Sequence, residues 1–281
     1  MFPENIGVCL CLDEIALSDG ELYTVLTNAR AKCQKGSLIA MVKGVKSGNV
    51  CEILKQIPLE KRKNVREVSV DMANNMEIIA ASCFPSAAVV TDRFHVAKLI
   101  TEAVQEIRIK HRWKAIKQEN RAVKRAKKSG KKYVARTFKN GDTKKQLLAR
   151  SRYLLFKPSN KWTESQKLRA EILFKKYPDI EKAYDLSMMF RNIYETAKSK
   201  TSANEQFVKW SEKVKNYNFD SFITASESVN SHKKTILNFF TNRTTNALAE
   251  SFNSKIKAFR SVFRGVRDID FFLYRVSLIF A

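Results

Sequence analysis

The chain has 281 residues, of which 44% are hydrophobic and 10% aromatic, so it can bury a sizeable core. This composition excludes a disordered tail. The 52 lysine and arginine residues outnumber the 28 aspartate and glutamate residues and give a formal net charge of +24. A charge of this size attracts polyanions, most commonly nucleic acid, but it identifies a class of partner and no function.

The first third of the sequence predicts three strands joined by short turns. Apolar runs cover residues 6–12, 21–27 and 37–42, and turn-forming residues at 18–20 and 35–36 separate them. Connections this short favour an antiparallel meander.

Helices and strands alternate in the next segment. The pattern predicts a helix over 48–57 that stops at Pro58, and then a strand over 65–70. A second helix over 72–83 and a strand over 87–91 follow. Strands that alternate with helices pair in parallel through crossover connections. The complete order is that of a ribonuclease-H-like α/β sheet with five strands, a topology that many α/β domains share in part.

Beyond the last of these strands the sequence predicts helices only. Charged and apolar residues recur at helical spacing as far as about residue 240. We therefore expect a core over 1–95, an all-helical insertion over 96–240, and C-terminal helices over 241–281 that complete the core.

The positive charge is concentrated in one part of this insertion. Residues 108–157 contain 19 lysines and arginines but only two acids, with aromatic residues between them. A basic stretch with interleaved aromatics favours contact with a nucleic-acid backbone, although a solvated helix face is the alternative. The predicted backbone-binding residues are Arg112, Lys114, Lys117, Arg121, Lys124, Arg125, Lys127, Lys128, Lys131 and Lys132.

The five cysteines predict neither disulfides nor a zinc site. They all lie between residues 9 and 83 in apolar, strand-like surroundings, and no CxxC or Cys/His cluster is present. Reduced core cysteines are typical of cytoplasmic proteins, so we expect a cytoplasmic, nucleoid-associated protein. The start of the chain lacks the features of a signal peptide, and no apolar run is long enough to span a membrane. We therefore expect no membrane partner.

Three aspartates follow apolar strands of the expected sheet. Asp13, Asp71 and Asp92 each stand where a predicted strand ends, and ligands bind beyond the carboxyl ends of strands in open α/β sheets. If the strands of Asp13 and Asp71 are neighbours, their Cα atoms lie roughly 5 Å apart. Two carboxylates at that distance repel each other unless a divalent cation bridges them. The alternative is that each acid forms a turn or caps a helix, as Asp92 could do for the helix that contains His95.

A fourth acid lies on a polar stripe of a late helix. Over residues 244–258, Asn246, Glu250, Asn253 and Lys257 fall within about 60° of one another on a helical projection. The apolar side chains fall on the opposite side of the helix. Asparagines inside a helix are poor helix formers, so their presence beside a glutamate suggests a polar site, although an ordinary amphipathic surface helix is the alternative.

Together these segments resemble the DDE transposases of the bacterial insertion-sequence family called ISL-three. The motifs that carry the resemblance are LDE at 12–14, VSVDM at 68–72, FPSAAVVTDRFH at 84–95 and NALAESFNSKIK at 246–257. The similarity extends over essentially the whole chain. It implies a ribonuclease-H-like catalytic core, an all-helical insertion before the last acidic helix, and metal-dependent cutting and joining of the ends of a mobile element.

The resemblance also implies roles for the acidic residues. Asp13 would be the first catalytic acid and Glu250 the third. We predict Asp71 as the second, because the strand of Asp92 lies one spacing further away, roughly 10 Å from Asp13. Asp92 and His95 would then shape the site, together with the polar residues of the helix that carries Glu250.

The mechanism that follows is a hypothesis about metal binding. Asp13, Asp71 and Glu250 would hold two Mg²⁺ or Mn²⁺ ions about 4 Å apart. One ion would activate a water molecule and later a 3′-hydroxyl, and the other would stabilise the departing 3′-oxygen. Carboxylate oxygens are hard ligands that suit these metals.

The expected partners are double-stranded DNA, at the element's ends and at the target, and further copies of the chain in an active homo-oligomer. Family members usually begin with a zinc module and a helix-turn-helix, whereas this sequence begins at the first strand. We therefore expect either a fragment or the catalytic half of a split transposase whose DNA-reading module is a separate polypeptide. Two alternatives are a catalytically inactive DNA-binding remnant and a ribonuclease-H-like nuclease specific for branched DNA.

Overall fold

The chain forms two compact units. The computed structural model describes residues 1–17, 20–243, 247–263 and 268–281, apart from the side chains of 247–250. One unit combines the first 96 residues with the segment from His232 to the C-terminus, and the other consists of residues 97–231.

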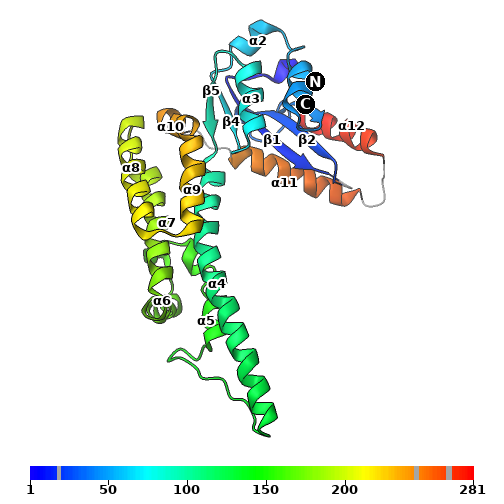
Figure 1. Ribbon diagram of the computed structural model, residues 1–281. Coiled ribbons are helices and arrows are strands. Elements are labelled where there is room, and N and C mark those ends of the chain that lie inside the picture. The colour runs from blue at the N-terminus through cyan, green and yellow to red at the C-terminus, as the bar shows by residue number, and fades with distance from the viewer. Residues whose placement is uncertain (18–19, 244–246, 264–267) are drawn as a thin grey trace. The chain divides into compact units, whose positions relative to one another are not determined.

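A five-stranded mixed sheet forms the centre of the first unit (Figure 1). Its strands are β1 (Cys9–Ala16), β2 (Leu22–Asn28), β3 (Leu38–Lys43), β4 (Glu67–Val70) and β5 (Ala88–Thr91). They lie in the order β3-β2-β1-β4-β5. The pairs β1–β2 and β2–β3 are antiparallel, while β1–β4 and β4–β5 are parallel. The predicted α/β fold with a mixed, ribonuclease-H-like sheet is confirmed.

Helices from the first half of the chain cover one face of this sheet. They are α1 (Ser47–Leu54) and α3 (Asn74–Cys83), and the short helix α2 (Leu59–Lys63) lies between them in the chain. Leu10 and Leu12 of β1 and Val68 and Val70 of β4 pack in one apolar core with Ile79 of α3. Because side chains alternate along a strand, the residues between these leucines and valines face the opposite side of the sheet.

The opposite face packs against the C-terminal helices α11 (Ala247–Val262) and α12 (Ile269–Phe280). Ile15 of β1 lies there in a second core with Phe252 and Ile256 of α11. Phe252 and Ile256 belong to the apolar stripe that the sequence predicts for this helix. The stripe therefore fixes which side of α11 faces the sheet.

The edge strand β5 is covered by α10 (Lys233–Asn242). Asn238 Nδ2 donates to the Val89 carbonyl at 2.7 Å, and the hydroxyls of Thr235 and Thr91 are 2.6 Å apart. These bonds use polar groups that an open sheet edge would expose. The sequence analysis assigned residues up to 240 to the insertion, whereas α10 belongs to the unit that contains the sheet.

The second unit is helical. Most of α4 (Arg93–Lys128) lies in it, followed by α5 (Lys144–Arg150), α6 (Glu164–Lys176), α7 (Pro178–Thr196), α8 (Lys200–Tyr217) and α9 (Asp220–Ser231). Phe190 of α7 and Trp210 of α8 are fully buried in its core, with ring centroids 4.8 Å apart. The predicted helical insertion is confirmed. No helix in the described ranges is both long and apolar enough to cross a membrane.

Buried charged groups hold α5 against its neighbours. Arg108 of α4 is 3% exposed and donates from Nη1 to the Leu148 carbonyl at 2.7 Å. Burial lowers the pKa of Arg108 to about 10, and it stays charged at neutral pH. Asp142 is fully buried just before α5, 2.5 Å from Arg150 Nη1 and 2.9 Å from Arg169 Nε. Part of the basic stretch is therefore structural.

Replacing Asp142 with asparagine should lower the free energy of unfolding by about 3 kcal/mol, because the mostly buried Arg169 loses the charge that compensates its desolvation. Chemical denaturation measures this loss. Glu164→Gln is the control, since Glu164 is exposed and its ion pair with Lys167 should contribute less than about 1 kcal/mol. Equal losses in the two variants would contradict the structural role of Asp142.

Candidate functional site

Three aspartates line up across the parallel part of the sheet. The register of β1 with β4 ends at the pair of Cys11 and Ser69, and continued by two residues it would align Asp13 with Asp71. The offset between β4 and β5 brings Asp71 beside Asp92, whose amide donates to the Val70 carbonyl at 2.8 Å. Paired strands lie about 4.8 Å apart, so the Cα of Asp13, just beyond the last pair, lies at least roughly 5 Å from that of Asp71, and Asp92 lies a further strand spacing away.

The end of β1 differs from the prediction. The sequence analysis ended this strand at Leu12, whereas β1 continues through Asp13 to Ala16. The continuation pairs with β2 alone, because the pairing of β1 with β4 stops at Cys11. Ile15 explains the longer strand, since its side chain is buried against the C-terminal helices. Asp13 therefore lies just beyond the last residue of β1 that pairs with β4.

Both carboxylate oxygens of Asp13 accept hydrogen bonds. Its side chain is on the face of the sheet that α11 covers, and the residue is only 9% exposed. Oδ1 accepts from the Glu14 amide at 2.8 Å, and Oδ2 accepts from Asn253 Nδ2 at 2.7 Å. The second bond joins residues 240 positions apart and fixes the polar stripe of α11 to the acidic end of the sheet.

The electrostatic surroundings of Asp13 favour its protonated form. Burial is the largest cause and raises the pKa of Asp13 to about 6, despite the lowering effect of the hydrogen bond from the Glu14 amide. The neighbouring carboxylate of Asp71 raises this pKa further, and His95 opposes it. A buried carboxylate beside a second one is the arrangement that a divalent cation stabilises.

The pKa of Asp13 predicts a gain in stability when its charge is removed. The folded chain holds this proton more tightly than the unfolded chain, in which an aspartate has a pKa of about 3.9. The resulting stabilisation is complete below pH 4 and is lost as the pH rises through 6. Without metal, Asp13→Asn should therefore raise the free energy of unfolding at pH 7.5 by up to about 3 kcal/mol, and by much less at pH 4.5.

Denaturation of both proteins in chelator at the two pH values measures this difference. Glu14→Gln is the matched control, because Glu14 is the next residue of β1 and its side chain is exposed on the opposite face. A gain for Asp13→Asn that is the same at both pH values would contradict the assignment of the buried charge to Asp13.

Asp71 and Asp92 have different surroundings. Asp71 is half-buried and accepts from the Ala73 amide at 2.9 Å, immediately before α3. Asp92 is 3% exposed and accepts from the Phe94 amide at 3.2 Å, in the first turn of α4. His95 Nε2 lies 3.9 Å from Asp92 Oδ2. Asp92 thus acts as a helix cap, while Asp71 is the nearer neighbour of Asp13.

The polar stripe of α11 is described in part. Asn253 contacts Asp13, and Lys257, one turn later on the same stripe, is exposed. Glu250 belongs to α11, but its side chain is outside the described residues, as is the whole of Asn246. Within the described part of the chain, no group of three or more histidines, cysteines, aspartates or glutamates is arranged to hold a metal ion. The three-acid site therefore remains a prediction.

Two buried polar residues on the same face were not predicted. Glu67 and Ser69 precede Asp71 at alternate positions of β4 and are 3% and 2% exposed. Glu67 Oε2 accepts from Asn242 Nδ2 of α10 at 3.0 Å. The alternation of polar residues at 67, 69 and 71 is the signal that could have identified them, because alternate residues share one face of a strand.

A buried thiol lies close to the acids. Burial, followed by the charges of Asp92 and Asp13, raises the pKa of Cys11 to about 12. Without a metal ion, Cys11 therefore stays protonated at neutral pH. The carboxylates of Asp13 and Asp71 are the oxygen ligands that this site offers to a divalent cation.

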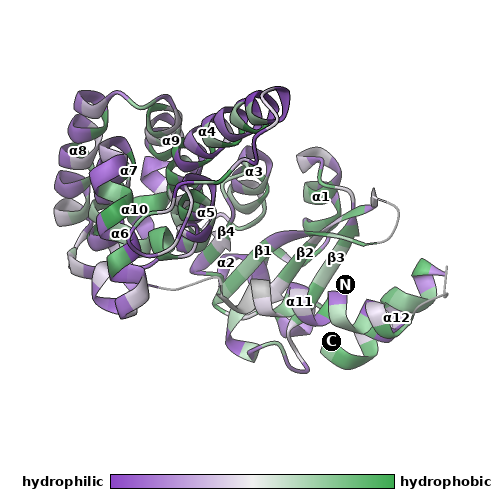
Figure 2. Cartoon of the chain, turned by 90° about the horizontal axis from the view of Figure 1, so that it is seen from below, coloured by the Kyte–Doolittle hydropathy of each residue, from purple (hydrophilic) through white to green (hydrophobic). Residues whose placement is uncertain are grey.

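The ten predicted backbone-binding residues are all exposed. Eight lie on α4, which is mostly hydrophilic (Figure 2), and Lys131 and Lys132 follow it. None of the ten forms an ion pair with an acid in the described part of the chain. Trp113, which lies among them on α4, is 59% exposed. This surface has the composition that a phosphate backbone attracts.

The chain matches a known protein family over most of its length. Residues 10–276 match the model of a family described as transposase. The matched range begins in β1 and ends in α12, so it includes the three predicted catalytic acids and the helical insertion. No protein of curated function matches the chain.

Proposed function

This chain belongs to the ISL-three family of DDE transposases, and we propose that it cuts and joins DNA strands at the ends of an insertion sequence in a metal-dependent reaction. The observation that carries the proposal is the position of Asp13 and Asp71 just beyond the paired residues of β1 and β4, with the pKa of Asp13 raised by burial and by Asp71. This acidic pair lies within the range that matches the family.

The residues present are suited to divalent metal ions. Asp13, Asp71 and Glu250 would hold Mg²⁺ or Mn²⁺ through oxygen atoms, which these metals prefer. When bound, the metal supplies an activated hydroxyl nucleophile and stabilises the charge that develops on the departing oxygen. Burial beside Asp71 makes the charged form of Asp13 unfavourable without a cation, and this supports the fit.

The chain's own residues orient the acids. The Glu14 amide and Asn253 Nδ2 hold the two oxygens of Asp13 in fixed directions. Glu250 stands three positions before Asn253 in α11, and residues at this spacing lie on the same side of a helix. This spacing, together with the bond from Asn253 to Asp13, supports Glu250 as the third acid of the proposed site.

The basic surface of α4 would hold the DNA through its phosphates. Replacing Lys124 and Lys128 with alanine should weaken binding and reduce the slope of log affinity against log salt by about 2, if each contacts one phosphate. The matched control is the double replacement of Lys209 and Lys215, which are exposed on α8. Salt titrations of DNA binding in chelator measure both slopes, and equal slopes in the two variants would contradict the assignment to α4.

A cleavage and strand-transfer assay tests the proposed function. The full chain is incubated with linear DNA that carries the ends of its own element, with a target plasmid, and with either Mg²⁺ or chelator. We expect nicks at the ends and joined products with Mg²⁺ only. DNA binding without cleavage in Mg²⁺ or Mn²⁺ would favour the inactive remnant. Cleavage of branched DNA without joining would favour a structure-specific nuclease.

A further inference from the structure

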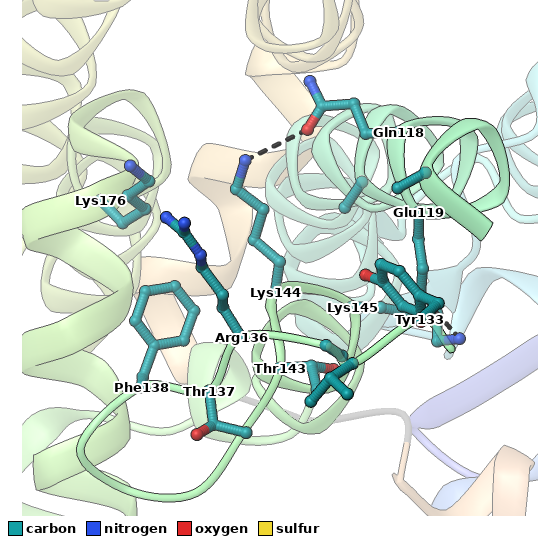
Figure 3. A pocket seen from close by; sticks show the side chains of 14 residues that line it. Gln118, Glu119, Tyr133, Arg136, Thr137, Phe138, Thr143, Lys144, Lys145 and Lys176 are labelled. Atoms are coloured by element: carbon teal, nitrogen blue, oxygen red, sulfur yellow. Dashed lines mark hydrogen bonds and ion pairs between the residues drawn. The ribbon is translucent and has the colours of Figure 1, made fainter. Parts of the chain in front are cut away.

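A hollow of about 490 Å³ lies in the helical unit (Figure 3). Its walls come from α4, from the loop over 133–138, from the start of α5 and from the end of α6. This volume lies in the range of small-ligand sites. It is large enough for one nucleotide and too small for a duplex.

Aromatic and cationic side chains line this hollow together. The ring of Phe138 lies on the same side as the side chains of Arg136 and Lys176, and Tyr133 lies at the other end beside Glu119 (Figure 3). Both aromatic residues are half-buried, so part of each ring is accessible. A planar base can stack on such a ring whatever its sequence.

The cations differ in how they are engaged. Lys144 Nζ donates to Gln118 Oε1 at 3.1 Å, and Lys145 pairs with Glu119 at 2.9 Å. Arg136 and Lys176 are exposed and pair with no acid in the described part of the chain. The end of the hollow near Phe138 therefore carries two positive charges that a phosphate group would neutralise.

The wall that carries Phe138 is held in place before any ligand binds. The Phe138 amide donates to the Asp142 carbonyl at 2.8 Å, and Thr137 bridges to Thr143 across the turn. Gly141 has a φ of +77°, which the turn requires. The buried pairs of the Asp142 carboxylate anchor this turn to α5 and α6. Such preorganisation reduces the entropic cost of binding.

We propose that this hollow binds one unpaired nucleotide of a DNA strand, with its phosphate on Arg136 and Lys176 and its base against Phe138. The inference rests on the proposed action of the chain on DNA, because cutting and joining produce strand ends that can leave the duplex. The neighbouring basic surface of α4 would hold the adjoining backbone, so the hollow distinguishes an unpaired end from continuous duplex.

Fluorescence of 2-aminopurine tests the proposal. The probe is a DNA duplex with a short single-stranded overhang that carries one 2-aminopurine, and a fully paired duplex with the same base is the comparison. The full chain is added in chelator, where no cleavage occurs. We expect quenching in the overhang only, and a loss of affinity of about tenfold for the overhang DNA in Arg136→Ala and in Phe138→Leu.

Two matched variants separate the hollow from the rest of the basic surface. Arg112→Ala removes a predicted backbone contact outside the hollow and should weaken binding of both DNAs alike. Phe156→Leu removes a half-buried ring of the same unit that does not line the hollow and should leave quenching unchanged. Arg136 is exposed, so its replacement tests the site even if Phe138→Leu destabilises the turn.

The outcomes distinguish this inference from the proposed function. Unchanged quenching and affinity in Arg136→Ala, or equal losses for the overhang and the paired duplex, would overturn the nucleotide site. Metal-dependent cleavage by a chain that fails to quench the probe would leave the proposed function standing without this site. Quenching by a chain that never cleaves DNA would refute the catalytic proposal alone.

Discussion

Replacing Glu250 with glutamine is expected to reduce metal-dependent strand cleavage at least about a thousandfold, which corresponds to roughly 4 kcal/mol in activation free energy. The carboxamide keeps the size of the side chain but removes the negative charge that a divalent ion requires. DNA affinity in chelator should change less than about twofold, because the predicted backbone contacts lie in another unit of the chain.

Cleavage rates and DNA affinities of the same preparations test this prediction. Glu14→Gln is the control. Glu14 is the residue after Asp13, and its carboxylate is exposed on the opposite face of β1. Its cleavage rate should stay within about twofold of the parent rate. A normal rate in Glu250→Gln would remove Glu250 from the site.

The second large effect is expected from Asp71→Asn, compared with Asp92→Asn. Asp71 follows β4 and interacts electrostatically with Asp13, so loss of its charge should lower cleavage about a thousandfold. Asp92 accepts from the Phe94 amide as a helix cap, and asparagine caps helices equally well. Asp92→Asn should therefore fold normally and retain most of its activity.

Cleavage rates measured in Mg²⁺ and in Mn²⁺, with thermal denaturation as a check on folding, separate these variants. The opposite order, with Asp92→Asn inactive and Asp71→Asn active, would move the second metal ligand to Asp92. Loss of activity in both variants with intact folding would mean that both carboxylates act in the reaction.

Local sequence patterns were enough to predict the sheet. Turn residues at 18–20 and 35–36 predicted the antiparallel pairing of the first three strands. The alternation of strands and helices up to β5 predicted the parallel pairing of the others. The end of β1 could not be predicted, because Asp13 interrupts its apolar run. The strand continues since Ile15 is buried by helices that lie more than 230 residues further along the chain.

The sequence predicted which residues belong to the candidate site, but it did not predict the contacts between them. The polar stripe of α11 identified Asn253, but its bond to Asp13 depends on how α11 packs on the sheet. The burial of Glu67 and the cover that α10 gives to β5 are also tertiary effects. Likewise, in the sequence Asp142 is one acid in a basic stretch, and its pairing with Arg150 and Arg169 depends on the fold.

Calorimetric titration of Mn²⁺ into the full chain tests most directly whether Asp13 and Asp71 form a metal site. We expect the parent chain to bind Mn²⁺ saturably. The affinity for Mn²⁺ should fall at least about a hundredfold in Asp13→Ala and should be retained in Glu14→Ala. Binding of Mn²⁺ by Asp13→Ala with the affinity of the parent chain would contradict the account.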